Sequence, residues 1–139
     1  MPELAKLVDL TPPLRHLIEA AAKAREHAYA PYSHFQVGAA ILTTSGAIYA
    51  GCNVENASYG ATMCAERAAV AAAVAAGERE FAAIALIADR VHPPTPCGIC
   101  RQVLAELAPA IDVVMANLAG DVLIASVDAL LPSPFGLIR

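Results

Sequence analysis

Three cysteines, placed at the expected starts of two helices, limit most strongly what this chain can fold into. Cys97 and Cys100 form a CxxC motif within the sequence PCGIC, and Cys64 stands two residues before Glu66. The unpaired backbone N–H groups at a helix N-terminus stabilise thiolates, so these positions suit metal ligands. Three thiolates can fill three corners of a zinc tetrahedron, and a fold that uses them so must bring the two helix starts together.

The residues around these cysteines favour catalytic rather than structural zinc. Catalytic sites keep one corner of the tetrahedron open for water, and three thiolates leave one such corner. Zinc lowers the pKa of its bound water towards about 7, so a nearby carboxylate can remove the proton and return it elsewhere. Glu66 is the candidate for this general acid/base. An ordinary exposed glutamate in a first helical turn is the competing interpretation.

Helix and strand patterns alternate along the chain. The expected helices cover residues 14–28, 64–76 and 97–107, and the expected strands cover residues 36–43, 47–53, 81–88, 111–116 and 122–125. Their signals are helical spacing or alanine-rich runs for the helices and short apolar runs for the strands. The first two strands should form a hairpin. This alternation predicts the α/β class with a single layered sheet.

Length, charge and composition indicate how many domains the chain has and which classes of partner it lacks. With 139 residues, we predict a single domain over residues 1–139. The formal net charge is −4 and Lys and Arg form no stripe, which argues against nucleic acid as a partner. No apolar run approaches the roughly 20 residues needed to cross a bilayer, and no signal-peptide pattern opens the chain. We therefore expect no membrane contact and a cytoplasmic location, where thiols stay reduced and available for metal.

An excess of alanine raises the hydrophobic share to 58%. Typical soluble domains contain about 45–50% even with glycine included. Because alanine lets helix backbones approach closely, we expect a homo-oligomer with helices packed at its centre. An alanine-rich genome explains the composition almost equally well.

The cysteine motifs and their surroundings resemble a known family. CAE followed by PCxxC matches the signature of zinc deaminases, with cysteine in place of histidine. The segments YAPYSHFQVGAA, GCNVENASYG, MCAERAA and PCGICRQVL, in this order, are similar to the small homotetrameric zinc-dependent cytidine deaminases. The resemblance covers nearly the whole chain and implies a three-layer α/β/α sandwich with a mixed, roughly five-stranded sheet.

The resemblance also implies an activity. It makes Cys64, Cys97 and Cys100 the Zn²⁺ ligands and Glu66 the proton shuttle. A zinc-bound hydroxide would attack cytidine or deoxycytidine, giving uridine or deoxyuridine and ammonia, a reaction of pyrimidine salvage. Arg67 would face the ligand sulfurs, where a cation offsets the charge of three thiolates.

The substrate contacts implied by the resemblance lie in several segments. Asn53 and Glu55 would hold the ribose hydroxyls, and their spacing of two projects both to one face of an extended segment. Phe35 would pack against the pyrimidine ring. Residues that match positions at a neighbouring subunit's site or beside the substrate are Ala57, Tyr59, Ala65 and Phe135. By default the aromatic residues would be core or interface residues.

Two other functions remain open. One is a deaminase of another aminated nucleoside such as blasticidin S, whose resistance enzyme shares the CAE and PCxxC pattern but resembles this chain less well at NVEN. The other is a non-catalytic zinc module in which Cys52 closes a four-cysteine shell. Cys52 follows a strand, so we expect a small buried hydrophobic residue there instead. The four histidines have no ligand spacing and should lie at the surface. Ile99, inside PCxxC, departs from the family's small residue.

Overall fold

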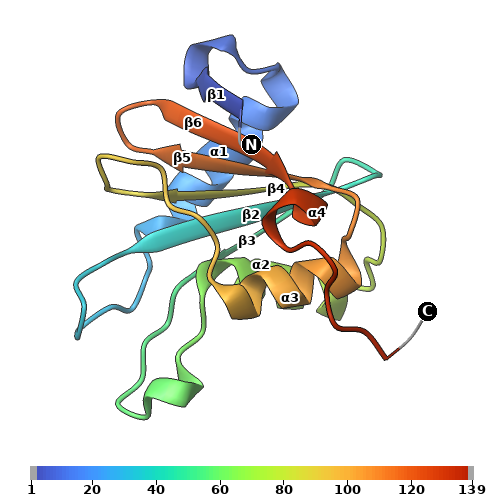
Figure 1. Ribbon diagram of the computed structural model, residues 1–139. Coiled ribbons are helices and arrows are strands. Elements are labelled where there is room, and N and C mark those ends of the chain that lie inside the picture. Colours follow the sequence, from blue (N-terminus) through green and yellow to red (C-terminus); the bar gives the residue numbers. More distant parts are fainter. Residues whose placement is uncertain (1–2, 138–139) are drawn as a thin grey trace.

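The computed structural model describes residues 3–137 as a mixed β-sheet with helices on both faces (Figure 1). Its strands are β1 (Glu3–Lys6), β2 (Val37–Thr43), β3 (Ile48–Cys52), β4 (Phe81–Ala88), β5 (Asp112–Asn117) and β6 (Asp121–Ser126). Their order across the sheet is β1-β6-β5-β4-β2-β3. β4 and β5 run parallel, and the other neighbouring pairs are antiparallel.

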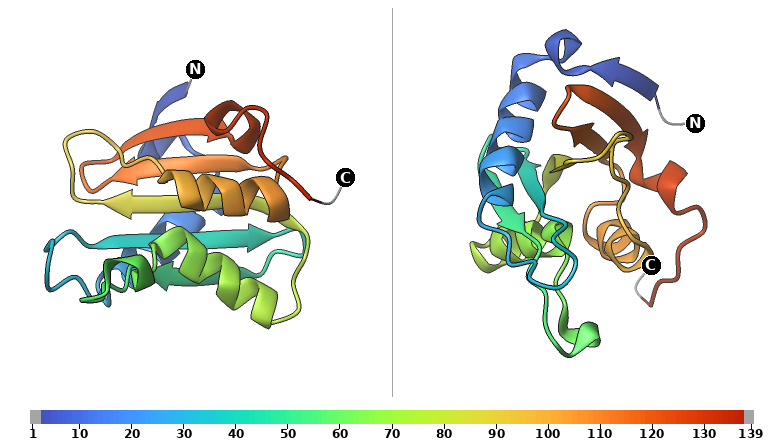
Figure 2. Two further views of the ribbon diagram at one scale, coloured as in Figure 1. Left: turned by 60° about the horizontal axis from the view of Figure 1, so that its bottom comes forward. Right: turned by 90° about the vertical axis from the view of Figure 1, so that its left-hand side faces the viewer.

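The helices form the outer layers. They are α1 (Pro12–Arg25), α2 (Ala65–Ala75), α3 (Gly98–Leu107) and the short α4 (Val127–Leu130). Figure 2 shows α1 on one face of the sheet and α2, α3 and α4 on the other. The predicted three-layer α/β/α arrangement is therefore confirmed. None of these helices is long and apolar enough to cross a membrane.

The sheet has six strands rather than the roughly five predicted, because β1 was not expected. Its sequence, ELAK, carries no run of β-branched or aromatic residues. β1 forms instead by antiparallel pairing with β6, in which Lys6 stands opposite Asp121. The short helix α4 was also not predicted. It begins after Ser126, whose side-chain oxygen accepts a hydrogen bond from the Ala129 N–H and so caps the first turn.

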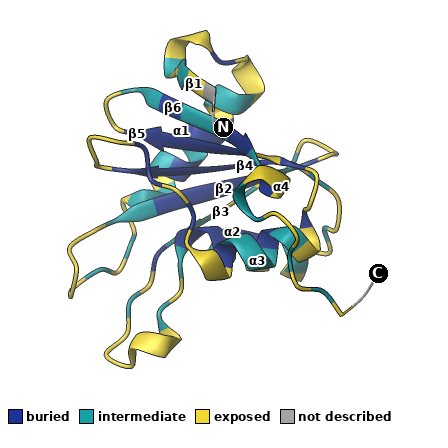
Figure 3. Ribbon diagram, in the orientation of Figure 1, coloured by how far each residue is buried: buried dark blue, intermediate teal, exposed yellow. Residues whose placement is uncertain are grey.

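The central strands are buried on both faces, as Figure 3 shows for β2, β4 and β5. On one face, side chains of α1 pack against the sheet around Leu17 and Ala85. On the other, α2 and α3 pack against it around Ile84 and Leu104. Helices on both faces explain why β4 is a nearly continuous apolar run.

Two glycines allow the helices to approach the sheet closely. A Cβ atom at Gly38 in β2 would lie 1.9 Å from the carbonyl oxygen of Ala21 in α1. A Cβ atom at Gly51 in β3 would lie 2.5 Å from the backbone nitrogen of Ala69 in α2. Both contacts are with backbone, so a side chain at either position would displace a helix.

The parallel connection β4–α3–β5 places the start of α3 beside the start of α2. Both helices begin where the predicted patterns begin, within one residue. Figure 2 shows their N-terminal ends on the same side of the sheet. This arrangement brings together the two sequence motifs that carry the cysteines.

Candidate active site and metal centre

The three predicted zinc ligands lie together. Cys64 is the N-cap of α2, Cys97 is the N-cap of α3, and Cys100 lies in the first turn of α3. Their sulfur atoms all lie within 4.8 Å of one another. Those of Cys64 and Cys97 are 3.6 Å apart. The fold therefore does bring the two helix starts together.

These distances suit a zinc ion. A Zn–S bond of about 2.3 Å with tetrahedral angles requires sulfur atoms about 3.8 Å apart. Cys100 is buried, Cys64 is half-buried and Cys97 is exposed, and both Cys64 and Cys97 line the adjacent pocket. The cluster is thus closed on the protein side and open towards the pocket, as a catalytic zinc site with one free position requires.

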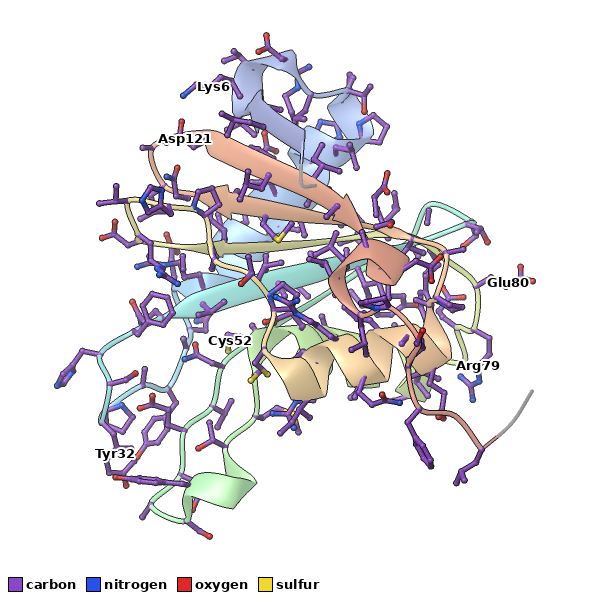
Figure 4. The ribbon with its side chains drawn as sticks, viewed as in Figure 1. Lys6, Tyr32, Cys52, Arg79, Glu80 and Asp121 are labelled. Carbon is purple, nitrogen blue, oxygen red and sulfur yellow. The ribbon has the colours of Figure 1, made fainter. Side chains whose placement is uncertain are left out.

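Cys52 does not join this cluster. Within residues 3–137, the group of possible metal ligands around these helix starts contains Cys64, Cys97 and Cys100 alone. Cys52 ends β3 opposite Gly38, and Figure 4 labels it near the start of α2. It is half-buried rather than fully buried as expected. This geometry speaks against a four-cysteine shell.

Glu66 is a buried residue in the wall of the pocket. Its exposed fraction is 5%, and it lines the same pocket as Cys64 and Cys97. Burial, with a smaller effect from the charge of Cys64, raises the pKa of this carboxyl to about 7. A group with such a pKa can both accept and return a proton near neutral pH. The exposed-glutamate interpretation is wrong.

Arg67 lies against the cysteine cluster as expected. Its Nη2 donates hydrogen bonds to Cys64 Sγ (3.4 Å) and to the Thr62 carbonyl oxygen (3.3 Å). A hydrogen bond shared with Cys100, followed by that from Arg67, lowers the pKa of Cys64 to about 5. The same hydrogen bond, together with burial, raises the pKa of Cys100. Arg67 therefore supplies positive charge to a site rich in sulfur.

The pocket in front of the cysteines has a volume of about 210 Å³. Its lining residues come from the region around the start of β2, the segment between β3 and α2, the first turn of α2, β4 and the segment between β4 and α3: Phe35, Val37, Asn53, Thr62, Met63, Cys64, Ala65, Glu66, Leu86, Arg90, Pro94, Thr95 and Cys97. Four predicted site residues besides the cysteines thus meet here, namely Phe35, Asn53, Ala65 and Glu66. An apolar wall with a few polar groups is typical of a small-molecule site.

Asn53 supports this wall as well as lining it. Its Oδ1 accepts a hydrogen bond from the Val37 N–H (2.9 Å), and its Nδ2 donates to the Phe35 carbonyl oxygen (2.8 Å). The side chain is 9% exposed. An amide has two N–H donors and two acceptor lone pairs, so one donor and one lone pair remain for a ligand.

Glu55 lies in a neighbouring pocket rather than beside Asn53. This second pocket is lined by Tyr32, Ser33, Glu55, Asn56, Tyr59 and Thr62, and shares Thr62 with the first. The Glu55 carboxylate accepts hydrogen bonds from the N–H groups of Tyr32 and Ser33 and from the Ser33 hydroxyl. The last of these hydrogen bonds is the main cause that lowers the pKa of Glu55. Figure 4 labels Tyr32 in this outlying loop region.

The remaining predicted residues lie outside the first pocket. Ala57 and Tyr59 are exposed on the segment before α2, and Tyr59 lines the second pocket. Phe135 is 72% exposed and lines a hollow near α3 and α4, where Gln102 Nε2 donates to its carbonyl oxygen. All four histidines are exposed, as expected.

Sequence reasoning missed the pocket residues after β4. Arg90, Pro94 and Thr95 belong to the segment between β4 and α3 and form one wall of the pocket. A usable signal existed, because ligands in α/β proteins bind beyond the carboxyl ends of the parallel strands. Residues 89–96 directly follow such a strand.

Known proteins resemble this chain in sequence and structure. Residues 13–117 match the family described as the cytidine and deoxycytidylate deaminase zinc-binding region. A cytidine deaminase of Halalkalibacterium halodurans is 53% identical over 120 residues, covering 86% of this chain and 91% of that protein. The crystal structure of cytidine deaminase from Burkholderia pseudomallei has a TM-score of 0.86 at 54% identity, covering 91% of this chain and 100% of that chain. For the Mycobacterium tuberculosis enzyme the TM-score is 0.77 at 39% identity, with coverage of 89% and 98%.

Proposed function

Because the chain belongs to the zinc-binding cytidine and deoxycytidylate deaminase family, we propose that it hydrolyses cytidine and deoxycytidine to uridine and deoxyuridine, with release of ammonia. The observation that carries the proposal is the buried carboxyl of Glu66 close to three clustered thiols, two of which line the same pocket as Glu66. A deamination of this kind needs a group that moves protons and a site for a metal, and both occur here.

Cys64, Cys97 and Cys100 would hold the zinc ion through their sulfur atoms. Zinc bound there would activate a water molecule by lowering its pKa. The Arg67 guanidinium would offset the negative charge of the thiolates, since it already donates to Cys64 Sγ.

Glu66 would carry the protons. With a pKa near 7, its carboxylate would take a proton from the attacking water and deliver it to the ring nitrogen N3. A second transfer through the same side chain would convert the leaving amino group into ammonia. Burial keeps bulk water from competing for these protons.

Asn53 and Phe35 would orient the nucleoside. The Phe35 ring lines the pocket and would pack against the pyrimidine, and the free donor and lone pair of Asn53 would bind a ribose hydroxyl. Glu55, in the adjoining pocket, would bind a second hydroxyl. A free base would leave the remaining donor and lone pair of the buried Asn53 amide without partners, which gives selectivity for nucleosides over nucleobases.

We also carry forward several expectations that rest on the family resemblance. They are one catalytic domain over residues 1–139, a homotetramer, a cytoplasmic location and a role in pyrimidine salvage. In such an assembly Ala57, Tyr59 and Phe135 would contact a neighbouring subunit's site.

The test is the ultraviolet loss of cytidine by zinc-loaded protein, beside Glu66→Gln and the exposed control Glu19→Gln. Removing a general acid/base lowers kcat about 10²–10⁴-fold, so Glu66→Gln should lose turnover while retaining zinc, and Glu19→Gln should match the parent. Free cytosine should react far more slowly than cytidine. A folded, zinc-loaded parent that leaves cytidine intact would refute the proposal, and turnover of blasticidin S instead would support the alternative nucleoside.

A further inference from the structure

The segment that joins β4 to α3 forms a wall of the pocket. It contributes Arg90, Pro94 and Thr95 and ends at Cys97. In Figure 1 it is drawn in gold and runs from the end of β4 across to the start of α3. Its position therefore affects both the pocket and one of the metal-binding sulfurs.

This segment has few polar attachments to the rest of the protein. Within the described range 3–137, residues 90–96 make no backbone–backbone hydrogen bond. Two side-chain donors hold it, one near each end. Asn117 Nδ2 donates to the Val91 carbonyl oxygen (2.9 Å), and Arg101 Nε donates to the Pro96 carbonyl oxygen (2.8 Å).

The side-chain amide of Asn117, which donates to Val91, is held in one orientation by its other hydrogen bonds. It is the last residue of β5, lies opposite Ala88 of β4 and is 2% exposed. Its Oδ1 accepts a hydrogen bond from the Asp121 N–H (2.9 Å), and its Nδ2 also donates to Asp121 Oδ2 (3.2 Å). These bonds fix the amide, since its oxygen and nitrogen cannot exchange places without losing all three contacts.

The network extends to the first strand. Asp121 forms an ion pair with Lys6 of β1, and Figure 4 shows the two residues labelled side by side. Asp121 shares no printed hydrogen bond with residues 90–96 and acts on them only through its charge, which His92 feels, whereas Asn117 donates the hydrogen bond to Val91. Substitutions of Asn117 and Asp121 therefore separate the loss of the hydrogen bond to the pocket wall from the loss of the ion pair between β6 and β1.

We propose that Asn117 is a positioning residue for the deaminase site, acting through Val91 on the segment that carries Arg90, Thr95 and Cys97. The inference rests on the proposed function. Without the Asn117 donor, the Val91 carbonyl loses its partner and the first half of the segment loses its polar anchor. The pocket wall and the Cys97 sulfur then become less well placed, and displacements of about 1 Å can lower rates by about 10²-fold.

The experiment compares Asn117→Ala with the matched control Asp121→Asn. Asp121→Asn removes the charge that pairs with Lys6 and acts on His92, but its amide oxygen still accepts from Asn117, and the hydrogen bond from Asn117 to Val91 stays. Measurements are made well below each variant's unfolding midpoint. They are kcat and KM for cytidine and the rate of zinc transfer to a coloured chelator.

Asn117→Ala should release zinc about 10-fold faster than the parent or more, and its kcat/KM should fall by about 10-fold or more. Groups that support metal ligands have effects of about 10–100-fold. Asp121→Asn should stay within about 2-fold of the parent in both. The proposal would be overturned if folded Asn117→Ala released zinc at the parent's rate and kept the parent's kcat/KM, and only its unfolding midpoint were lower. If that variant does not fold, Asn117→Ser, which keeps an oxygen acceptor for the Asp121 N–H and adds no charge beside the Asp121 carboxylate, is measured with the same two outcomes. A parent without cytidine turnover would contradict the proposed function, while the zinc-release comparison would still decide the role of Asn117.

Discussion

Replacing Gly51 with alanine should lower activity by displacing α2, the helix that packs against this glycine. The new Cβ would lie 2.5 Å from the Ala69 nitrogen and 2.7 Å from the Ala68 Cβ, whereas ordinary contact begins at 3.4 Å. The α2 backbone must therefore move away from β3 by about 0.9 Å. Overpacking of this kind costs about 1–3 kcal/mol of stability. Because Cys64 is the N-cap of α2 and Glu66 lies in its first turn, a shift of this size should lower kcat/KM by about 10²-fold.

The control is Gly38→Ala, which displaces α1 on the opposite face of the sheet. Its Cβ would approach the Ala21 oxygen more closely still, at 1.9 Å. It should therefore lower the unfolding free energy at least as much as Gly51→Ala, yet α1 supplies no residue to the pocket. The assays are urea unfolding and cytidine turnover at a temperature where both variants are folded. Equal losses of kcat/KM in both variants, or none in either, would refute the reasoning.

Three further predictions use metal content and stability. Cys52→Ala should retain zinc like the parent on dialysis, whereas Cys100→Ala should lose it, because only Cys100 belongs to the sulfur cluster. Arg67→Gln should weaken zinc affinity by about 10–100-fold in competition with a chelator, because it removes the donor to Cys64. Lys6→Ala should lower stability by no more than about 1 kcal/mol, since its ion pair is exposed, and the difference should shrink in high salt when thermal unfolding is compared.

The metal cluster and the central strands were predictable because their signals are local. Helix-start positions for Cys64 and Cys97, with Gly77 and Pro109 ending the two helices, need no knowledge of distant contacts. The buried strand β4 follows from its apolar run alone. β1 was missed because its stability comes from pairing with β6, a partner more than 100 residues later in the sequence.

The substrate side of the site was only partly predictable, for a reason that is visible in the backbone. A spacing of two places Asn53 and Glu55 on one face only while the chain stays in a regular strand. β3 ends at Cys52, and Val54 then bridges to both Tyr29 and Met63. Glu55 consequently turns towards Ser33 and the second pocket. Tertiary contacts, which sequence spacing does not describe, decided this position.

Asn53 both lines the pocket and holds its backbone by hydrogen bonds, which limits how this position can be changed. A substitution there removes a pocket wall residue and also the brace between Phe35 and Val37, so altered specificity would come with lost stability. A substitution of Glu55 would likewise remove the hydrogen bonds that hold the loop at Tyr32 and Ser33. By contrast, the side chains of Arg90 and Thr95 line the pocket and make no hydrogen bond to any other described residue. Directed evolution towards other nucleosides should therefore accumulate its early changes at positions 90 and 95, where new chemistry can be acquired without weakening the scaffold.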